Sequence, residues 1–276
     1  MANQTLPQTL SDKLLATVVK VTPHIANHIL KRQNNHNRNL RPRAVADYAR
    51  DMAAGNWTPN GEGIKFDRNG TLLDGQHRLT ALIEADVDVP MLFITGLDPK
   101  AQETMDTGRP RTPSDVFALR GEARTVVLAA VLRRVWMWDQ GNHKFFASQA
   151  PTRPELAALL EAHPEIRRSA EISGYVYQTY RSLPQSIIGT AHHVFSRIDG
   201  DAAVWFFTRL GDGAELPLGH PVLTLRNRAS ADRKEGKRMP EPRAMAYLVH
   251  AWNAVREGRS LTRITIPVEA PMPMPR

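Results

Sequence analysis

The sequence predicts an α+β protein, in which a small mixed sheet with helices is followed by a mainly α-helical part. Three observations support this class. Short β-branched segments alternate with amphipathic helical patterns up to about residue 115. Beyond that point strand signals are nearly absent until residues 261–266. Hydrophobic residues make up 42% of the 276 residues, which is enough to form a buried core.

The first part is predicted to open with a strand and two helices. Residues 17–21 are mostly β-branched and predict a short strand. Thr22 followed by Pro23 is typical of a helix start, because the hydroxyl caps free N–H groups and proline fits the first helical position. A second helix is predicted by an i, i+3, i+4, i+7 apolar stripe made of Val45, Tyr48, Ala49 and Met52. Gly55 follows that helix, where a left-handed residue commonly ends one.

A hairpin, a helix and a strand are predicted next. Strands at 63–66 and 71–73 flank the turn-forming residues 67–70. A helix is expected over 76–85, and an apolar strand over 89–94 is expected to end at Thr95-Gly96. Asp98-Pro99 and Thr112-Pro113 predict two further helix starts.

The second part is predicted to be helical, with one late strand at 261–266. The expected helices cover 123–138, 153–162, 184–197, 202–210, 221–231 and 243–257. We therefore expect a mixed domain at 14–115 and a helical domain at 116–266. A tail at 267–276 alternates Pro and Met, and we expect it to be disordered or draped over the surface.

Composition narrows the classes of partner and chemistry. The formal net charge of +8 favours contact with phosphates, either of nucleotides or of nucleic acid. The absence of cysteine excludes disulfides, thiol catalysis and cysteine-ligated zinc, and it fits a cytoplasmic location. No run of about 18 apolar residues is present, so no membrane span is expected. Residues 1–12 lack the apolar stretch of a signal peptide.

The segment Asp74-Gly75-Gln76-His77-Arg78 stands between a predicted strand and a predicted helix. A glycine there allows a ligand to approach the backbone, and the free N–H groups of a helix start attract anions. Cationic side chains in a first helical turn are unfavourable unless an anion is present. His77 and Arg78 therefore indicate a phosphate site. The alternative interpretation is an ordinary Asp74 cap followed by a surface histidine and arginine.

This segment, with Leu73, Leu79 and Ala81, resembles the phosphate-binding motif of the ParB/sulfiredoxin superfamily. Sulfiredoxin has a Gly-Cys-His-Arg version, the ADP-dependent free serine kinase an Asp-Gly-His-His-Arg version, and chromosome-partitioning ParB a Gly-Glu-Arg-Arg version. The flanks are also similar, at Asn37-Arg38, Trp57, Glu62, Ile64 and 105–115. The resemblance covers about residues 14–115 and is strongest to phage and bacterial ParB-like proteins, whose companion domain the helical part resembles.

The resemblance implies a nucleotide-binding site that contains Gly75, Gln76, His77, Arg78, Asp106, Arg109 and Arg111. The implied ligands are Mg²⁺ and a nucleoside tri- or diphosphate such as ATP, ADP or CTP. Glu62, Asp74 and His77 are the implied catalytic residues, and Asp74 is the implied Mg²⁺ ligand. Alternatively, Glu62 is a surface carboxylate beside a turn, and residues 107–110 form only a turn.

Two departures from the relatives limit what the resemblance implies. Gln76 stands where sulfiredoxin has its catalytic cysteine, which excludes sulfinic-acid repair. Partitioning ParB has two consecutive arginines at the positions of His77 and Arg78, and no helix-turn-helix of the centromere-reading type is evident in this chain.

A basic segment in the helical part is a candidate DNA-binding surface. It contains Arg226, Arg228, Arg233, Lys234, Lys237 and Arg238, a density that can follow a phosphate backbone. The alternative is a solvated loop. The adjacent His192 and His193 lie in an apolar pattern that favours a core or surface role over metal binding.

Three function classes follow from these patterns. The first is an NTP-dependent enzyme that transfers or hydrolyses a phosphoryl group with Mg²⁺. The second is a DNA-binding ParB-like module, either nucleotide-gated or nuclease-like. The third is a phage-encoded interaction protein that uses the same fold as a scaffold. Nucleotide binding is common to the first two classes, and we place the enzyme first.

Overall fold

The computed structural model describes residues 13–35, 37, 39–105, 111–234, 239–267 and 270–276. The chain divides into two compact units, Met1–Pro110 and Arg111–Arg276. The first contains a four-stranded sheet with helices, and the described part of the second is helical. The α+β class predicted from the sequence is confirmed.

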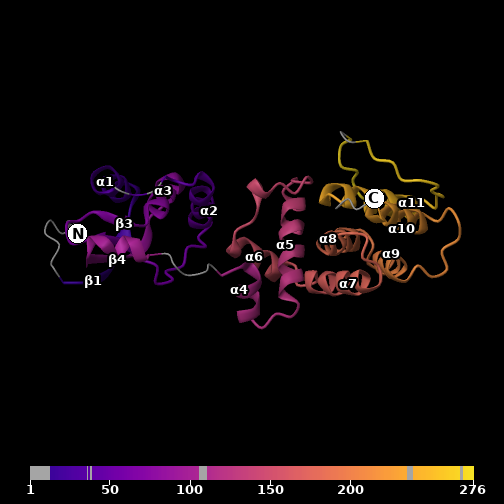
Figure 1. Cartoon of the computed structure of the whole chain (residues 1–276), viewed down its shortest axis with the longest axis horizontal. Helices are drawn as coiled ribbons and strands as arrows, with labels where there is room; N and C mark the ends of the chain where they lie inside the picture. The colour runs from indigo at the N-terminus through magenta and orange to yellow at the C-terminus, as the bar shows by residue number, and fades with distance from the viewer. Residues whose placement is uncertain (1–12, 36, 38, 106–110, 235–238, 268–269) are drawn as a thin grey trace. The chain divides into compact units, whose positions relative to one another are not determined.

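The sheet of the first unit has the order β1-β4-β2-β3 (Figure 1). Its strands are β1 (Leu15–Val21), β2 (Ile64–Asp67), β3 (Leu72–Asp74) and β4 (Val89–Leu97). β1 pairs with β4 and β3 pairs with β2 in antiparallel fashion, whereas β2 and β4 run parallel. The parallel pair requires a crossover, and the helix that follows β3 provides it.

Three helices lie on one face of this sheet (Figure 1): α1 (Pro23–Gln33), α2 (Pro42–Ala53) and α3 (Gln76–Ala85). Side chains such as Ile29, Met52, Leu79 and Phe93 are buried between the two layers. The predicted start of α1 is confirmed, because the Thr22 hydroxyl accepts the N–H of Ile25 at 3.2 Å. The layer places the amino ends of α2 and α3 close to the end of β3.

Two predictions in the first unit need correction. The last strand continues beyond Ile94, because Thr95 pairs with Leu15 and Leu97 with Asp67. The helix expected after Asp98-Pro99 is a short 3₁₀ helix, η1 (Pro99–Thr104). The turn at 67–70 agrees with its prediction, since the Asp67 carboxylate accepts the N–H groups of Asn69 and Thr71, each at 2.8 Å.

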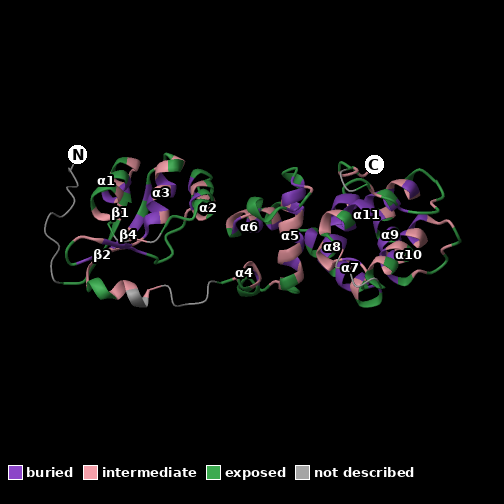
Figure 2. Ribbon diagram, turned by 45° about the horizontal axis from the view of Figure 1, so that its top comes forward, coloured by how far each residue is buried: buried purple, intermediate pink, exposed green. Residues whose placement is uncertain are grey.

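The second unit contains eight described α-helices and a 3₁₀ helix, η2 (Ala147–Gln149). The α-helices are α4 (Pro113–Leu119), α5 (Thr125–Asp139), α6 (Arg153–Ala162), α7 (Ile166–Thr179), α8 (Gln185–Ser196), α9 (Gly200–Asp212), α10 (Pro221–Lys234) and α11 (Glu241–Arg256). Figure 2 shows the buried residues of α7, α8, α9 and α11 facing the interior of the bundle. The ring of Phe195 stacks on Trp252 at 4.5 Å between centroids, in the middle of this core.

The strand expected at 261–266 is wrong, since these residues pair with no strand among the described residues. They lie against α10 and the loop before it instead: the Leu261 carbonyl accepts from the Thr224 hydroxyl on α10, and its N–H donates to the carbonyl of Gly219 at 2.8 Å. The described part of the tail lies along the surface of α11. This agrees with the second of the two alternatives predicted for the tail. Trp252 donates to the carbonyl of Arg276 and Asn253 to that of Met274, each at 2.9 Å.

Candidate functional site

Gly75 joins β3 to α3 and is fixed by packing against β2. Its φ of 112° is left-handed, and an added Cβ would lie 2.5 Å from the Cδ1 of Ile64 and 3.3 Å from the Ile64 Cα. Side chains rarely adopt that φ, and no Cβ fits at that distance. Close approach to β2 therefore accounts for the glycine, whereas the sequence had suggested close approach of a ligand.

Arg78 is buried in the first unit, where it acts as a clamp, that is, a side chain whose hydrogen bonds hold two segments together. Its guanidinium donates to the carbonyl of Glu62 at 2.8 Å and to that of Gly63 at 2.9 Å, and its side chain is 10% exposed. The same group donates to the Asp74 carboxylate at 3.1 Å. Three protein acceptors thus hold the fork that the sequence had assigned to a phosphate. Arg78 fixes the segment before β2 against the start of α3.

Asp74 lies between two cations. Its Oδ2 atom accepts from the Lys65 ammonium at 3.2 Å as well as from Arg78. The helix cap is Gly75, with no side-chain hydrogen bond, so the alternative in which Asp74 caps the helix is wrong. Lys65 faces Asp74 across the β2–β3 hairpin. The sequence analysis did not identify Lys65, which a bulge in the hairpin places opposite Asp74.

His77 lies where the amino ends of α2 and α3 meet. Its Nε2 accepts the backbone N–H of Arg41, the residue before α2, at 2.9 Å. Neither N-cap residue, Arg41 or Gly75, caps its helix with its own side chain, and the first turns of both helices, which are fully described, contain no acidic residue. Each helix amino end carries roughly half a positive charge. Two such ends therefore face a half-buried imidazole.

A network of amide side chains surrounds the edge strand β3. Asn37 donates to the carbonyl of Leu72 at 2.6 Å, and Gln102 donates to that of Leu73 at 2.9 Å. Gln102 also donates to Asn37 at 3.1 Å. Gln76 is buried and accepts from Asn34 at 3.4 Å. The Gln76 side chain thus supports the loop after α1, and only its backbone is placed as the sequence had predicted.

Of the remaining predicted site residues, the structure describes Glu62 and Arg111. Glu62 is exposed and precedes β2; its backbone carbonyl accepts from Arg78, and its backbone N–H donates to the Asn60 side chain at 3.0 Å. Arg111 is exposed and belongs to the second unit. Asp106 and Arg109 lie outside the described residues. The structure therefore brings together residues 74–78, with the backbone of Glu62 beside them.

Most described cations of the α10 segment have partners within the second unit. Arg226 donates to the carbonyls of Leu210 and Gly211 and lies 4.6 Å from the ring centroid of Tyr180. Arg228 contacts Asp232 and the Tyr247 hydroxyl. Arg233 donates to the Arg181 carbonyl. Lys234 is exposed, and Lys237 and Arg238 lie outside the described residues. These contacts give Arg226 and Arg228 roles in helix packing, whereas Arg233 is exposed although it contacts the Arg181 carbonyl.

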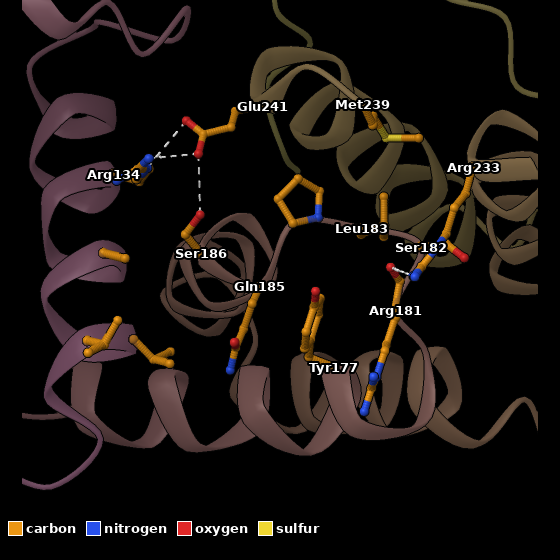
Figure 3. A pocket seen from close by; sticks show the side chains of 14 residues that line it. Arg134, Tyr177, Arg181, Ser182, Leu183, Gln185, Ser186, Arg233, Met239 and Glu241 are labelled. Carbon is orange, nitrogen blue, oxygen red and sulfur yellow. Dashed lines mark hydrogen bonds and ion pairs between the residues drawn. The ribbon is translucent and has the colours of Figure 1, made fainter. Parts of the chain in front are cut away.

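The second unit also contains a pocket of about 480 Å³ between α5, α7, α8 and the start of α11 (Figure 3). Glu241 at its rim accepts from Arg134 at 2.7 Å and from Ser186 at 3.4 Å. Arg181 and Arg233 also line the pocket. Sequence patterns gave no signal for it, because its lining residues come from five separate helices, including Arg233 on α10, and from two loops.

The chain was compared with family models, curated proteins and solved structures. No family model, no curated protein and no solved structure matches the chain. The ParB/sulfiredoxin resemblance remains an expectation that rests on the motif and its flanks. Among the helices of the described residues, none combines the length and the apolar character needed to span a bilayer.

Proposed function

We propose that the first unit binds the phosphates of a nucleotide at the amino end of α3, beside His77. One observation carries the proposal. The amino ends of α2 and α3 meet at the His77 imidazole, neither N-cap residue (Arg41 or Gly75) caps its helix with its own side chain, and neither first turn contains an acidic residue. Helix starts usually carry such groups, because they satisfy free N–H donors and the positive helix dipole. A bound phosphate would accept hydrogen bonds from backbone N–H donors and would also balance the positive end of the helix dipole.

The electrostatic balance of the neighbouring residues supports an anion. Lys65 and Arg78 share the single carboxylate of Asp74, so this corner carries a surplus of positive charge. A negative group at one helix start gains typically about 0.3–1 kcal/mol, and up to about 2 kcal/mol when partly buried. Two convergent helix starts with one excess cation therefore favour a ligand with several negative charges, as a nucleotide has.

In this proposal the motif residues divide into two roles. His77 and the backbone of Gln76 and His77 contact phosphate oxygens. Arg78, with Asp74, positions the start of α3 against the segment before β2, because its donors already hold the Glu62 and Gly63 carbonyls. The Gln76 side chain positions the loop after α1. The motif is thus a phosphate-binding helix start together with the clamp that orients it.

We propose that Mg²⁺ enters with the nucleotide. Mg²⁺ commonly keeps several waters and is held by substrate phosphates with one or two carboxylates. Asp74 already neutralises two cations, so it is a poor candidate for a direct Mg²⁺ ligand. Glu62 is the better candidate for acid–base chemistry, because its carboxylate is exposed while its backbone is held by Arg78.

The binding proposal is tested by thermal unfolding with ATP, ADP, CTP and GTP in the presence of Mg²⁺. Wild type should be stabilised by at least one nucleotide, because a ligand specific for the folded state raises the unfolding temperature. His77→Gln keeps an acceptor for the Arg41 N–H and should still bind. His77→Glu keeps that acceptor but repels phosphate, and should lose the shift.

The exposed residue His28 on α1 offers a matched control. His28→Ala should retain the full shift. If no nucleotide stabilises wild type, or if His77→Glu responds as wild type does, the binding proposal is wrong.

Turnover is tested separately, by phosphate release from each nucleotide that binds. Glu62→Gln should abolish release while the thermal shift persists, because the substitution keeps the backbone carbonyl that Arg78 holds. Binding without release in wild type would limit the function to nucleotide binding. A salt-sensitive gel shift that disappears in Lys234→Ala would instead favour the DNA-binding alternative.

A further inference from the structure

Three potential metal ligands meet in the second unit, away from the residues assigned so far. His163 follows the last residue of α6, Glu165 precedes α7, and His193 lies in α8. One ligand atom from each lies within 4.8 Å of the other two. The Glu165 Oε1 atom is 3.1 Å from the Nδ1 of His163 and 3.9 Å from the Nδ1 of His193. The connection between α6 and α7 therefore brings His163 and Glu165 next to His193 of the buried helix α8.

His193 provides an independent sign of a ligand. Its side chain is 1% exposed, and neither ring nitrogen has a hydrogen-bond partner among the described residues. Leaving a buried polar group unsatisfied costs about 1–3 kcal/mol. The neighbouring His192 differs, because its Nδ1 lies 2.9 Å from the Ser169 hydroxyl. The Glu165 oxygen is too distant to satisfy His193 by a hydrogen bond.

The charged residues next to His193 leave room for a cation. Arg197 lies near the ring, but it is paired with Asp139 at 2.9 Å, so its positive charge is largely balanced beside the site.

We propose that His163, Glu165 and His193 bind a divalent transition-metal ion, of which Zn²⁺ is the best match. Two imidazoles and a carboxylate suit zinc, whereas Mg²⁺ prefers oxygen ligands. A tetrahedral ion with bonds of about 2.0–2.1 Å holds its ligand atoms roughly 3.3 Å apart. The observed 3.1 and 3.9 Å require only small side-chain rotations. His163 and Glu165 are 40% and 53% exposed, so they are free to adjust.

A bound ion would link the α6–α7 corner to α8 in the core of the second unit. Three protein ligands leave a fourth position for water or a substrate atom, an arrangement found in catalytic zinc sites. The two exposed ligands place that position towards solvent. This site shares no residue with the proposed phosphate site, so the metal proposal can be correct or wrong whatever the outcome for nucleotide binding.

The test uses untagged full-length protein, stripped with EDTA and titrated with Zn²⁺, Co²⁺ or Mg²⁺. We expect Zn²⁺ to bind one to one by calorimetry and to raise the unfolding temperature, and Co²⁺ to give visible absorption bands of a protein-bound ion. Mg²⁺ should do neither. His163→Ala should abolish Zn²⁺ binding, and Glu165→Gln should weaken it by about tenfold or more.

Two further variants complete the design. His28→Ala removes an exposed histidine in the first unit and should bind Zn²⁺ as wild type does. His193→Leu should abolish binding while circular dichroism still reports a helical protein; if it does not fold, the two exposed variants decide. The proposal is overturned if wild type does not bind Zn²⁺, or if His163→Ala and Glu165→Gln bind it with unchanged affinity.

Discussion

At the scale of single residues, the motif is defined by what its side chains hold in place. Gly75 brings α3 against β2, Arg78 holds the two carbonyls before β2, and Asp74 balances Arg78 and Lys65. His77 is the side chain at which two helix amino ends meet. In our proposal, the five-residue motif thus combines one side chain that would bind phosphate with several that fix its position.

Gly75→Ala should destabilise the first unit by roughly 2 kcal/mol or more, because the new Cβ meets Ile64 at a left-handed φ. Gly61→Ala is the matched control, since Gly61 has a φ of 84° with nothing within 4 Å of its Cβ position. It should cost only about 1–2 kcal/mol. Hydrogen exchange of peptides from α3 reports the difference locally. Equal losses of protection in the two variants would contradict the packing argument.

The sequence predicts the local structure of the motif but not the contacts of its side chains. Strand, glycine and helix were predictable from local patterns at 71–85. The two backbone partners of Arg78 were not, because every residue has a carbonyl and the sequence does not distinguish those of Glu62 and Gly63 from the others. Lys65 was not predictable from the turn either, because the register at Phe66 and Leu72 would place it opposite Leu73, and a bulge between Lys65 and Phe66 brings it opposite Asp74 instead.

At the scale of elements, α7 shows where periodicity fails. Residues 166–179 form a helix that the sequence analysis did not predict, and this segment contains Gly174 together with Tyr175, Val176 and Tyr177. β-branched and aromatic residues have modest helix propensity, and glycine has less. Tertiary packing overrides these local preferences, because α7 buries one face against α8 and α9.

The packing of α8 gives a test at this scale. An added Cβ at Gly189 would lie 2.5 Å from the Cγ2 of Val131 on α5 and 3.2 Å from the Ser169 carbonyl on α7. Gly189→Ala should therefore lower the stability of the second unit by about 1–3 kcal/mol. Gly174→Ala meets only ordinary contacts and should be neutral or stabilising by up to about 1 kcal/mol. Urea unfolding followed by circular dichroism measures both, and a stable Gly189→Ala would refute the close helix contact.

An ion pair between the α4–α5 connection and α7 predicts a pH dependence. Arg167 donates to Glu122 at 2.8 Å, and this hydrogen bond holds the pKa of Glu122 below its usual value of 4.5. A carboxyl with a depressed pKa in the folded state stabilises the fold above pH 4.5 and loses this contribution as the pH falls below it. Glu122→Gln should flatten that part of the stability–pH curve. An unchanged curve between wild type and variant would contradict the role of this pair.

At the scale of the whole molecule, the two units have separate hydrophobic cores. Residues of the first core all lie in the first unit, and the two clusters of the second unit draw only on residues after Pro110. The change in sequence character was enough to predict two parts, because mixed strand and helix signals give way to helical ones. The exact division was harder to place, since α4 begins with the same cap-plus-proline signal as α1.

Separate cores predict separate responses to ligands. A nucleotide with Mg²⁺ should reduce hydrogen exchange in peptides covering the starts of α2 and α3, and leave peptides of α6, α7 and α8 unchanged. Zn²⁺ should do the reverse, because its proposed ligands all lie in the second unit. Protection of the same peptides by both ligands would show that the two sites are coupled, contrary to this prediction.

The most direct test of phosphate binding is the response of individual backbone amides. In ¹⁵N-labelled protein, titration with ADP and Mg²⁺ should shift the amide signals of Gln76, His77 and Arg78 most, while adenosine, which lacks phosphates, should leave them in place. Shifts confined to residues of the second unit, or equal shifts with adenosine, would contradict the claim that phosphates bind at the start of α3.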